Sequence, residues 1–237
     1  MEAIKDVLED IKKNLTERFR ENIRCLILYG SWAKGLARED SDIDLLVVFE
    51  AINKETGKVI HEIESRIDGE RNITFVPTNL EDFRKERLPL FTAVKKEGKV
   101  IYGKVDLSIN PEAPAIKYAE FFKRSHDFES QKIRIAEELL KDGFNSGIAD
   151  LCFVASKHAI QAALAVRGEG YSSKMVILQP LAEKYFGKET VEAFRKLFHL
   201  YIKSEYGMEF LTEEEARLAV ECAKKILKIY ESGHSDL

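Results

Sequence analysis

Residues 30–48, GSWAKGLAREDSDIDLLVV, form the most informative stretch of the sequence. One apolar run, IRCLILY at residues 23–29, comes directly before it, and a second, IDLLVVF at residues 43–49, overlaps its end. Both runs have the length and composition of strands that are buried on both faces. We therefore predict that the two runs are neighbouring strands of one sheet. The segment that connects them begins with Gly-Ser and ends with Asp-x-Asp.

The paired aspartates, Asp42 and Asp44, open the second run. Side chains alternate faces along a strand, so these two point the same way with their stems roughly 7 Å apart. Two carboxylates so placed can close on one hard cation. Magnesium (Mg2+) prefers oxygen ligands and is commonly completed by substrate phosphates. We therefore expect Asp42 and Asp44 to hold a magnesium ion that arrives with a nucleotide.

The Gly-Ser pair, Gly30 and Ser31, would supply the other half of this site. A glycine lets the backbone approach a phosphate closely, and the amide and hydroxyl of Ser31 can donate to phosphate oxygens at a helix N-terminus. Lys34 and Arg38 are the nearest cations; they either contact the nucleotide or are solvated turn residues. The segment lacks the Gly-Lys-Ser/Thr ending of a Walker A loop.

The rest of the first half alternates helical and strand patterns. An amphipathic helix is expected over residues 4–19 and another over 58–67, with strands over residues 72–76 and 99–102. Pro77 is expected to end the third strand, and Thr78 with Glu81 forms a candidate capping box for a short helix. The pattern predicts a small mixed sheet with helices, an α/β (α+β) domain.

The second half is helical throughout. Helices are expected over residues 116–141, 146–166, 175–185, 189–206 and 213–230. Pro180 should kink or restart the third of these, and Thr212 with Glu215 is a capping box at the start of the last. Short connections favour an all-α antiparallel helical bundle. The predicted domains are residues 1–107 and 112–237.

Composition limits the classes of function. The 237 residues are 45% hydrophobic, and 37 Lys+Arg against 41 Asp+Glu give a net charge of -4, which excludes a strongly basic nucleic-acid-binding surface. Three cysteines lie far apart in apolar stretches, which suits core positions in a reducing compartment. The sequence shows neither a signal peptide nor an apolar run long enough for a membrane span. We expect a cytoplasmic protein without membrane contact.

Gly30-Ser31, ten intervening residues and Asp42-Ile43-Asp44 followed by LLVV resemble the polymerase-beta-type nucleotidyltransferase superfamily, in its minimal nucleotidyltransferase branch. The resemblance covers residues 1–102. It implies that Gly30 and Ser31 hold the triphosphate of a nucleotide, while Asp42 and Asp44 bind magnesium. ATP is the expected nucleotide. It also implies transfer of a nucleotidyl group to a hydroxyl of a protein or small-molecule acceptor.

The sequence departs from this family at the position of a third carboxylate. In the family a later strand carries an acid that completes the metal site, and here Thr74 stands at that position. Glu81, Asp82 and Asp106 are conceivable substitutes, but solvated helix or loop acids are the simpler interpretation. Thr74 therefore keeps open a nucleotide-binding regulatory protein without transferase activity.

The second half, residues 115–230, is similar to a HEPN domain, on its helix pattern and on the stretch ASKHAIQAAL at residues 155–164. This resemblance implies a homodimer formed through the helical domain. Kanamycin-type nucleotidyltransferases carry a similar bundle, so an aminoglycoside-type enzyme with a bundle glutamate as base is a further alternative. Many HEPN ribonucleases use an arginine followed, after four to six residues, by a histidine. Arg195 and His199 are separated by only three residues, which argues against an RNA-processing toxin.

Overall fold

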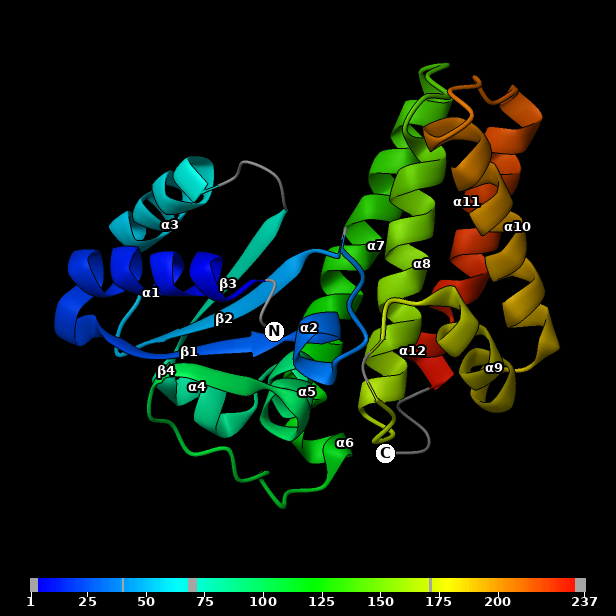
Figure 1. Cartoon of the computed structure of the whole chain (residues 1–237). Coiled ribbons are helices and arrows are strands. Elements are labelled where there is room, and N and C mark those ends of the chain that lie inside the picture. The colour runs from blue at the N-terminus through cyan, green and yellow to red at the C-terminus, as the bar shows by residue number, and fades with distance from the viewer. Residues whose placement is uncertain (1–3, 40, 68–71, 171, 233–237) are drawn as a thin grey trace. The chain divides into compact units, whose positions relative to one another are not determined.

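The protein is described by a computed structural model over residues 4–39, 41–67, 72–170 and 172–232. It contains two compact units, Met1–Pro111 and Glu112–Leu237 (Figure 1). Each unit has its own hydrophobic core.

The first unit is built on a four-stranded mixed sheet with the strand order β3-β2-β1-β4. The strands are β1 (Ile23–Tyr29), β2 (Ile43–Phe49), β3 (Ile73–Asn79) and β4 (Lys99–Gly103). Strand β1 pairs antiparallel with both β2 and β4, and β2 pairs parallel with β3. The prediction that the two apolar runs are neighbours in a small mixed sheet is therefore confirmed.

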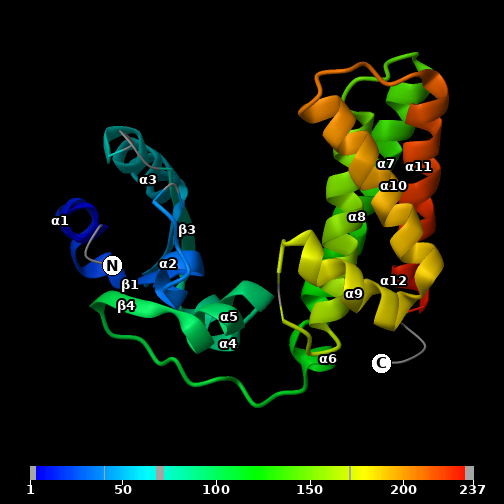
Figure 2. The ribbon, with the colours of Figure 1, turned by 45° about the vertical axis from the view of Figure 1, so that its right-hand side comes forward.

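Helices cover both faces of this sheet (Figure 2). One face carries α1 (Lys5–Phe19) and α3 (Lys54–Ile67), while the other carries α4 (Leu80–Lys85) and α5 (Pro89–Glu97); a 3-10 turn, η2 (Arg20–Asn22), follows α1. Along β2, Leu45 and Val47 pack toward α1, whereas Leu46 and Val48 pack toward α5. Both faces are buried, which explains why this strand is a continuous apolar run.

Three local predictions in this unit are wrong. Strand β3 continues through Pro77, because β3 is an edge strand and a missing backbone N–H is tolerated there. The cap of α4 is Asn79, whose side chain accepts a hydrogen bond from the Asp82 amide at 2.8 Å, while Thr78 is buried in the strand. Helix α3 begins at Lys54 rather than Lys58, because the side chain of Asn53 accepts hydrogen bonds from the first amides of the helix.

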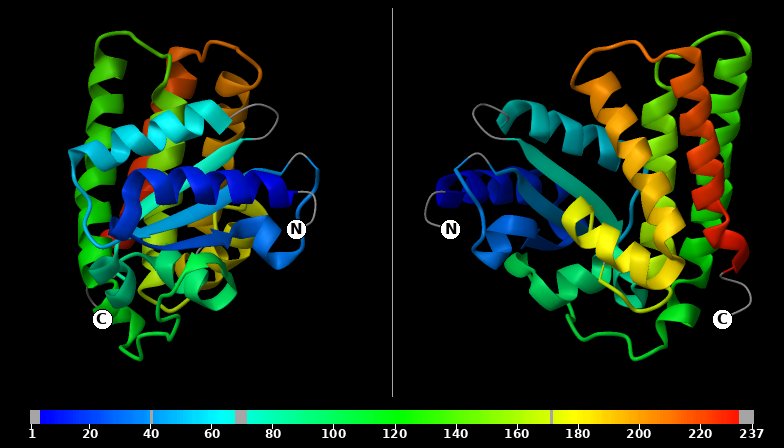
Figure 3. Two further views of the ribbon diagram at one scale, coloured as in Figure 1. Left: turned by 60° about the vertical axis from the view of Figure 1, so that its left-hand side comes forward. Right: turned by 90° about the vertical axis from the view of Figure 1, so that its right-hand side faces the viewer.

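The second unit is a helical bundle centred on α8 (Figure 3). Its helices are α6 (Pro114–Lys117), α7 (Ala119–Lys141), α8 (Ile148–Ala165), α9 (Met175–Phe186), α10 (Lys188–Glu205), α11 (Glu213–Leu227) and α12 (Ile229–Ser232). Helices α7 and α8 are antiparallel neighbours, as are α10 and α11, and α8 contacts α7, α10 and α11. The predicted all-α antiparallel bundle is confirmed.

Some of the predicted helix boundaries in the bundle are wrong, and one predicted helix cap is confirmed. The predicted first and last helices are each divided in two, and α9 runs through Pro180 without restarting. The capping box of α11 is present: the Glu215 amide donates to the Thr212 hydroxyl at 3.2 Å, and the Thr212 amide donates to the Glu215 carboxylate at 2.9 Å.

Helix α8 is the most apolar element of the bundle. Among the described helices it is the one whose length and composition would allow it to cross a membrane, but 72% of it is buried inside the bundle, as expected for a core helix. Cys152, on this helix, is free and buried, as are Cys25 and Cys222. Burial raises the pKa of the Cys152 thiol to about 12. The prediction that the cysteines are core residues is confirmed.

Candidate active site

The predicted site forms where β1 ends and the short helix α2 (Gly30–Lys34) begins. Tyr29, the last residue of β1, pairs directly with Asp44 of β2. Gly30 has a φ of +71°, and a Cβ atom built on it would lie only 2.2 Å from Oδ2 of Asp44. The carboxylate of Asp44 therefore rests against the first residue of α2, and this position favours glycine for both conformational and steric reasons.

Asp44 lies in β2, and Asp42 comes two residues earlier, just before the strand begins. Ile43 and Leu45 are buried toward α1 and α3, so Asp44 points to the opposite side of the sheet. Asp42 is exposed, and Asp44 is partly buried. Burial raises the pKa of the Asp44 carboxyl, and the nearby Asp42 carboxylate raises it further. Two carboxylates that disfavour each other's charge are an arrangement that a bound cation would relieve.

The buried side chain of Trp32, the residue after Ser31, connects α2 to the segment that leads into β2. The indole N–H of Trp32 donates to the backbone oxygen of Ser41 at 3.0 Å, and the Ser41 hydroxyl accepts from the amide of Arg38 at 2.8 Å. Ser31 is partly buried in the first turn of α2, and among the described residues its hydroxyl has no hydrogen-bond partner. The side chain of Ser31 is thus available at the start of the helix, beside Gly30.

The two predicted cations differ in their surroundings. The ammonium of Lys34 forms an ion pair with the Glu97 carboxylate of α5 at 2.5 Å, and both side chains are about half exposed. The side chain of Arg38 is exposed and pairs with no acid among the described residues. In this structure Lys34 is therefore directed to a protein carboxylate, whereas Arg38 is solvated.

Thr74 occupies the position next to Asp44 on the neighbouring strand. In the parallel pairing of β2 with β3, Ile43 lies beside Ile73 and Asp44 beside Thr74. Ile43 and Ile73 are both buried on the α1 side, so Asp44 and Thr74 share the other side. Across the described part of the chain no group of three or more His, Cys, Asp and Glu side chains could hold a metal ion. The site offers two carboxylates.

The three candidate substitute acids are engaged elsewhere. Glu81 pairs with Lys85 at 2.6 Å, and this hydrogen bond lowers its pKa. Asp82 accepts a hydrogen bond from the Asn79 side chain at 2.7 Å. Asp106 accepts from the amide and hydroxyl of Ser108, which lower its pKa. Each of these carboxylates stabilises a local turn or helix end.

Two protein-family models match the chain. Residues 9–106 match the family model described as Polymerase beta, Nucleotidyltransferase, and residues 130–233 match the HEPN domain. The chain carries a nucleotidyltransferase domain followed by a HEPN domain. Gly30, Ser31, Asp42, Asp44 and Thr74 all lie within the nucleotidyltransferase match.

Curated relatives match parts of the chain. The chain is 46% identical over 52 residues to the Protein adenylyltransferase MntA of Thermococcus cleftensis, which is 22% of this chain and 50% of that protein. It is 28% identical over 105 residues to the Putative protein adenylyltransferase MJ1305 of Methanocaldococcus jannaschii, which is 42% of this chain and 71% of that protein. The chain thus spans about half the length of the first of these relatives.

A solved structure shares the fold of both domains. It is the spectinomycin adenyltransferase AAD(9) from Enterococcus faecialis with ATP and spectinomycin, at a TM-score of 0.50 and 14% sequence identity. The match covers 94% of this chain and 98% of that one. At this identity the likeness concerns the fold alone.

Two residues near the site of the nucleotidyltransferase domain were not predicted from the sequence. Tyr29 faces Asp44 across the strand pair; burial, with a contribution from the Asp44 carboxylate, raises the pKa of its hydroxyl to about 12. Its place directly before the Gly-Ser pair was an available signal. Glu97, the partner of Lys34, could not be found in this way, because α5 was not predicted.

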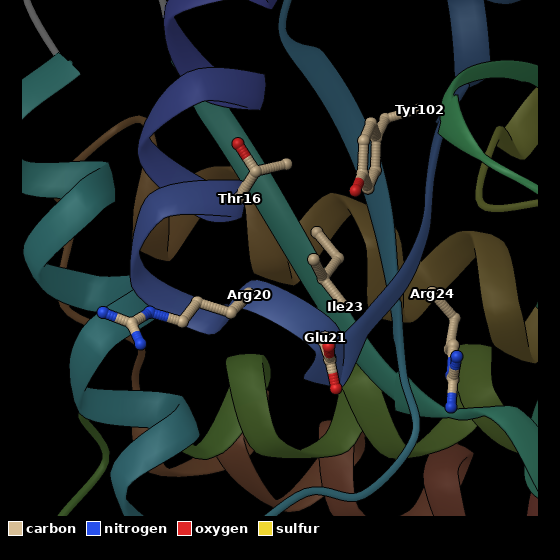
Figure 4. A pocket seen from close by; sticks show the side chains of 6 residues that line it. All are labelled: Thr16, Arg20, Glu21, Ile23, Arg24 and Tyr102. Carbon is tan, nitrogen blue, oxygen red and sulfur yellow. The ribbon is translucent and has the colours of Figure 1, made fainter.

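The nucleotidyltransferase domain also has a pocket at the other end of β1, with a volume of about 510 Å³ (Figure 4). It is lined by Thr16, Arg20, Glu21, Ile23, Arg24 and Tyr102. Ile23 begins β1 and Gly30 follows its end, so these two residues lie about 23 Å apart at roughly 3.3 Å a residue. The two arginine side chains extend in different directions, and Arg24 pairs with Glu50 at 2.8 Å. The pocket therefore takes no part in the site.

Proposed function

We propose that this protein binds the magnesium complex of ATP and transfers its adenylyl group to a hydroxyl of a protein or small-molecule acceptor. The observation that carries the proposal is the carboxylate of Asp44 resting against Gly30, with the Asp42 carboxylate near enough to raise the pKa of Asp44. An acidic oxygen donor thus lies directly beside the start of α2, with a second acid close to it. The adenylyltransferase names of the relatives support ATP as the nucleotide.

The residues divide the work by their chemistry. Gly30 lets the triphosphate approach the backbone, and the amide and hydroxyl of Ser31 donate hydrogen bonds to its oxygens. Asp42 and Asp44 supply carboxylate oxygens, a donor set that suits magnesium with phosphates completing its coordination. When bound, the ion would offset the negative charge that accumulates on the phosphate oxygens.

The proposed reaction is an attack by the acceptor hydroxyl oxygen on the α-phosphorus of ATP. A new bond forms between the hydroxyl oxygen and the α-phosphorus. The bond between the α-phosphorus and the oxygen that bridges the α- and β-phosphates breaks, and pyrophosphate leaves. The hydroxyl proton passes to solvent. The contribution of the protein in this scheme is to position the triphosphate and to balance its charge.

A second candidate function is nucleotide binding without transfer, in a regulatory role. It is favoured by Thr74, which contributes no charge where the family carries a third acid. Incubation of the protein with ATP labelled at the α-phosphorus and candidate acceptors separates the two functions. Sustained pyrophosphate release with label on an acceptor supports transfer, whereas tight binding without release supports the regulatory role.

Two wider proposals accompany this function. The HEPN domain would form a homodimer, which light scattering on the purified protein would test by mass. A cytoplasmic location is supported by three free, buried cysteines, which suit a reducing compartment. Localisation of a tagged chain would test it.

A further inference from the structure

The neighbour of Asp44 on β3 determines how many cations the site can hold. Adjacent strands lie about 4.8 Å apart, so the side chain at position 74 reaches the same space as that of Asp44. Thr74 is exposed at an edge strand and points to the side of the two aspartates, opposite Ile73. An acid at this position could share an ion with Asp44, but a threonine hydroxyl brings no charge.

Two divalent cations in one site need more negative charge than one cation does. In two-metal sites the ions lie about 3.5–4 Å apart and repel each other, so bridging and flanking carboxylates are required to hold both. The described residues offer Asp42 and Asp44 and no third acid in reach of them. Glu81, Asp82 and Asp106 are tied to other groups, as described above.

We propose that Thr74 restricts the nucleotidyltransferase domain to one divalent cation for each bound nucleotide. The inference rests on the proposed function, because it assumes that the Asp42–Asp44 pair binds a cation with a nucleotide. In consequence the domain offers no position for a second cation. A single substitution, Thr74→Asp, restores the missing charge and creates a second cation position.

The test counts Mn2+ ions bound to the full chain in the presence of the non-hydrolysable analogue α,β-methylene-ATP. Isothermal titration gives the stoichiometry, and electron paramagnetic resonance distinguishes an isolated Mn2+ from a coupled pair. We expect one ion and an uncoupled spectrum for the wild type, and two ions with a coupled spectrum for Thr74→Asp. Thr74→Asn is the matched control, since it has the shape of aspartate without its charge, and it should bind one ion.

The possible outcomes separate the inference from the function beneath it. Two ions in the wild type would overturn the inference while leaving nucleotide binding intact. One ion in a folded Thr74→Asp variant would overturn it as well. No ion in the wild type would overturn the proposed function and the inference together. The wild-type count needs no variant, so the inference stays testable even if Thr74→Asp fails to fold.

Discussion

The contact between Gly30 and Asp44 makes a quantitative prediction for Gly30→Ala. The new residue would have to keep a φ of +71°, which costs roughly 1–2 kcal/mol for a residue with a Cβ atom. Its Cβ would also lie 2.2 Å from Oδ2 of Asp44, where ordinary contacts begin at 3.4 Å. The carboxylate must move, and turning it away from its preferred rotamer costs about 0.5–1.5 kcal/mol more. The total loss in the free energy of unfolding is about 2–3 kcal/mol.

Gly35→Ala is the matched control for this substitution. Gly35 has the same φ of +71°, but a Cβ atom there would meet no other atom within 4 Å. Its cost is therefore the conformational part alone, about 1–2 kcal/mol. The difference between the two variants isolates the contact with Asp44.

Both stability and binding can be read from the same samples. The sequence contains a single tryptophan, Trp32, which lies in α2 between the two glycines, so its fluorescence reports urea unfolding of this unit. Binding of Mg-ATP is measured by titration calorimetry. Because Gly30→Ala displaces Asp44, the proposed cation ligand, we expect its affinity to fall about tenfold or more, whereas Gly35→Ala should retain most of its affinity. Equal affinities for the two variants would refute the role assigned to the Gly30–Asp44 contact.

Three other substitutions test separate parts of the account. Asp44→Asn should raise the melting temperature of the cation-free protein at neutral pH. Burial raises the pKa of Asp44 above its ordinary 3.8, so the wild type loses stability as the pH rises from 3.8 through this raised pKa. The difference in melting temperature between the variant and the wild type should therefore disappear at acid pH. Glu97→Gln should release Lys34 and strengthen Mg-ATP binding about two- to fivefold by calorimetry, with a change in stability below about 1 kcal/mol because the pair is half exposed; unchanged affinity would identify Lys34 as a solvated turn residue. Lys95 of α5 and Glu86 form a buried ion pair at 2.9 Å. Lys95→Met should cost about 3–5 kcal/mol in urea unfolding, because it removes the ammonium group that pairs with this buried carboxylate, and a loss below 1 kcal/mol would contradict this.

The two apolar runs and the paired aspartates were predictable because each depends on local pattern. A continuous apolar run of seven residues is typical of a strand buried on both faces, and the two aspartates open the second of these runs in the sequence itself. The capping box at Thr212 was likewise visible, because both of its partners lie within one turn.

The remaining details depend on contacts distant in sequence. The extension of β3 past Pro77 requires knowing that β3 is an edge strand, and this extension moves the cap from Thr78 to Asn79. The meeting of Gly30 with Asp44 depends on the register that pairs Tyr29 with Asp44. Such registers are set by packing of the whole sheet, and the residues of the connecting segment do not encode them locally.

A calorimetric titration of the full chain with Mg-ATP, beside the double variant Asp42→Ala with Asp44→Ala, tests whether the two aspartates bind the metal–nucleotide complex. Asp10→Ala, an exposed acid on α1, serves as the control. The account predicts magnesium-dependent binding in the wild type and in Asp10→Ala, and loss of that binding in the double variant. The same affinity in all three proteins, or no magnesium-dependent binding in the wild type, would contradict it.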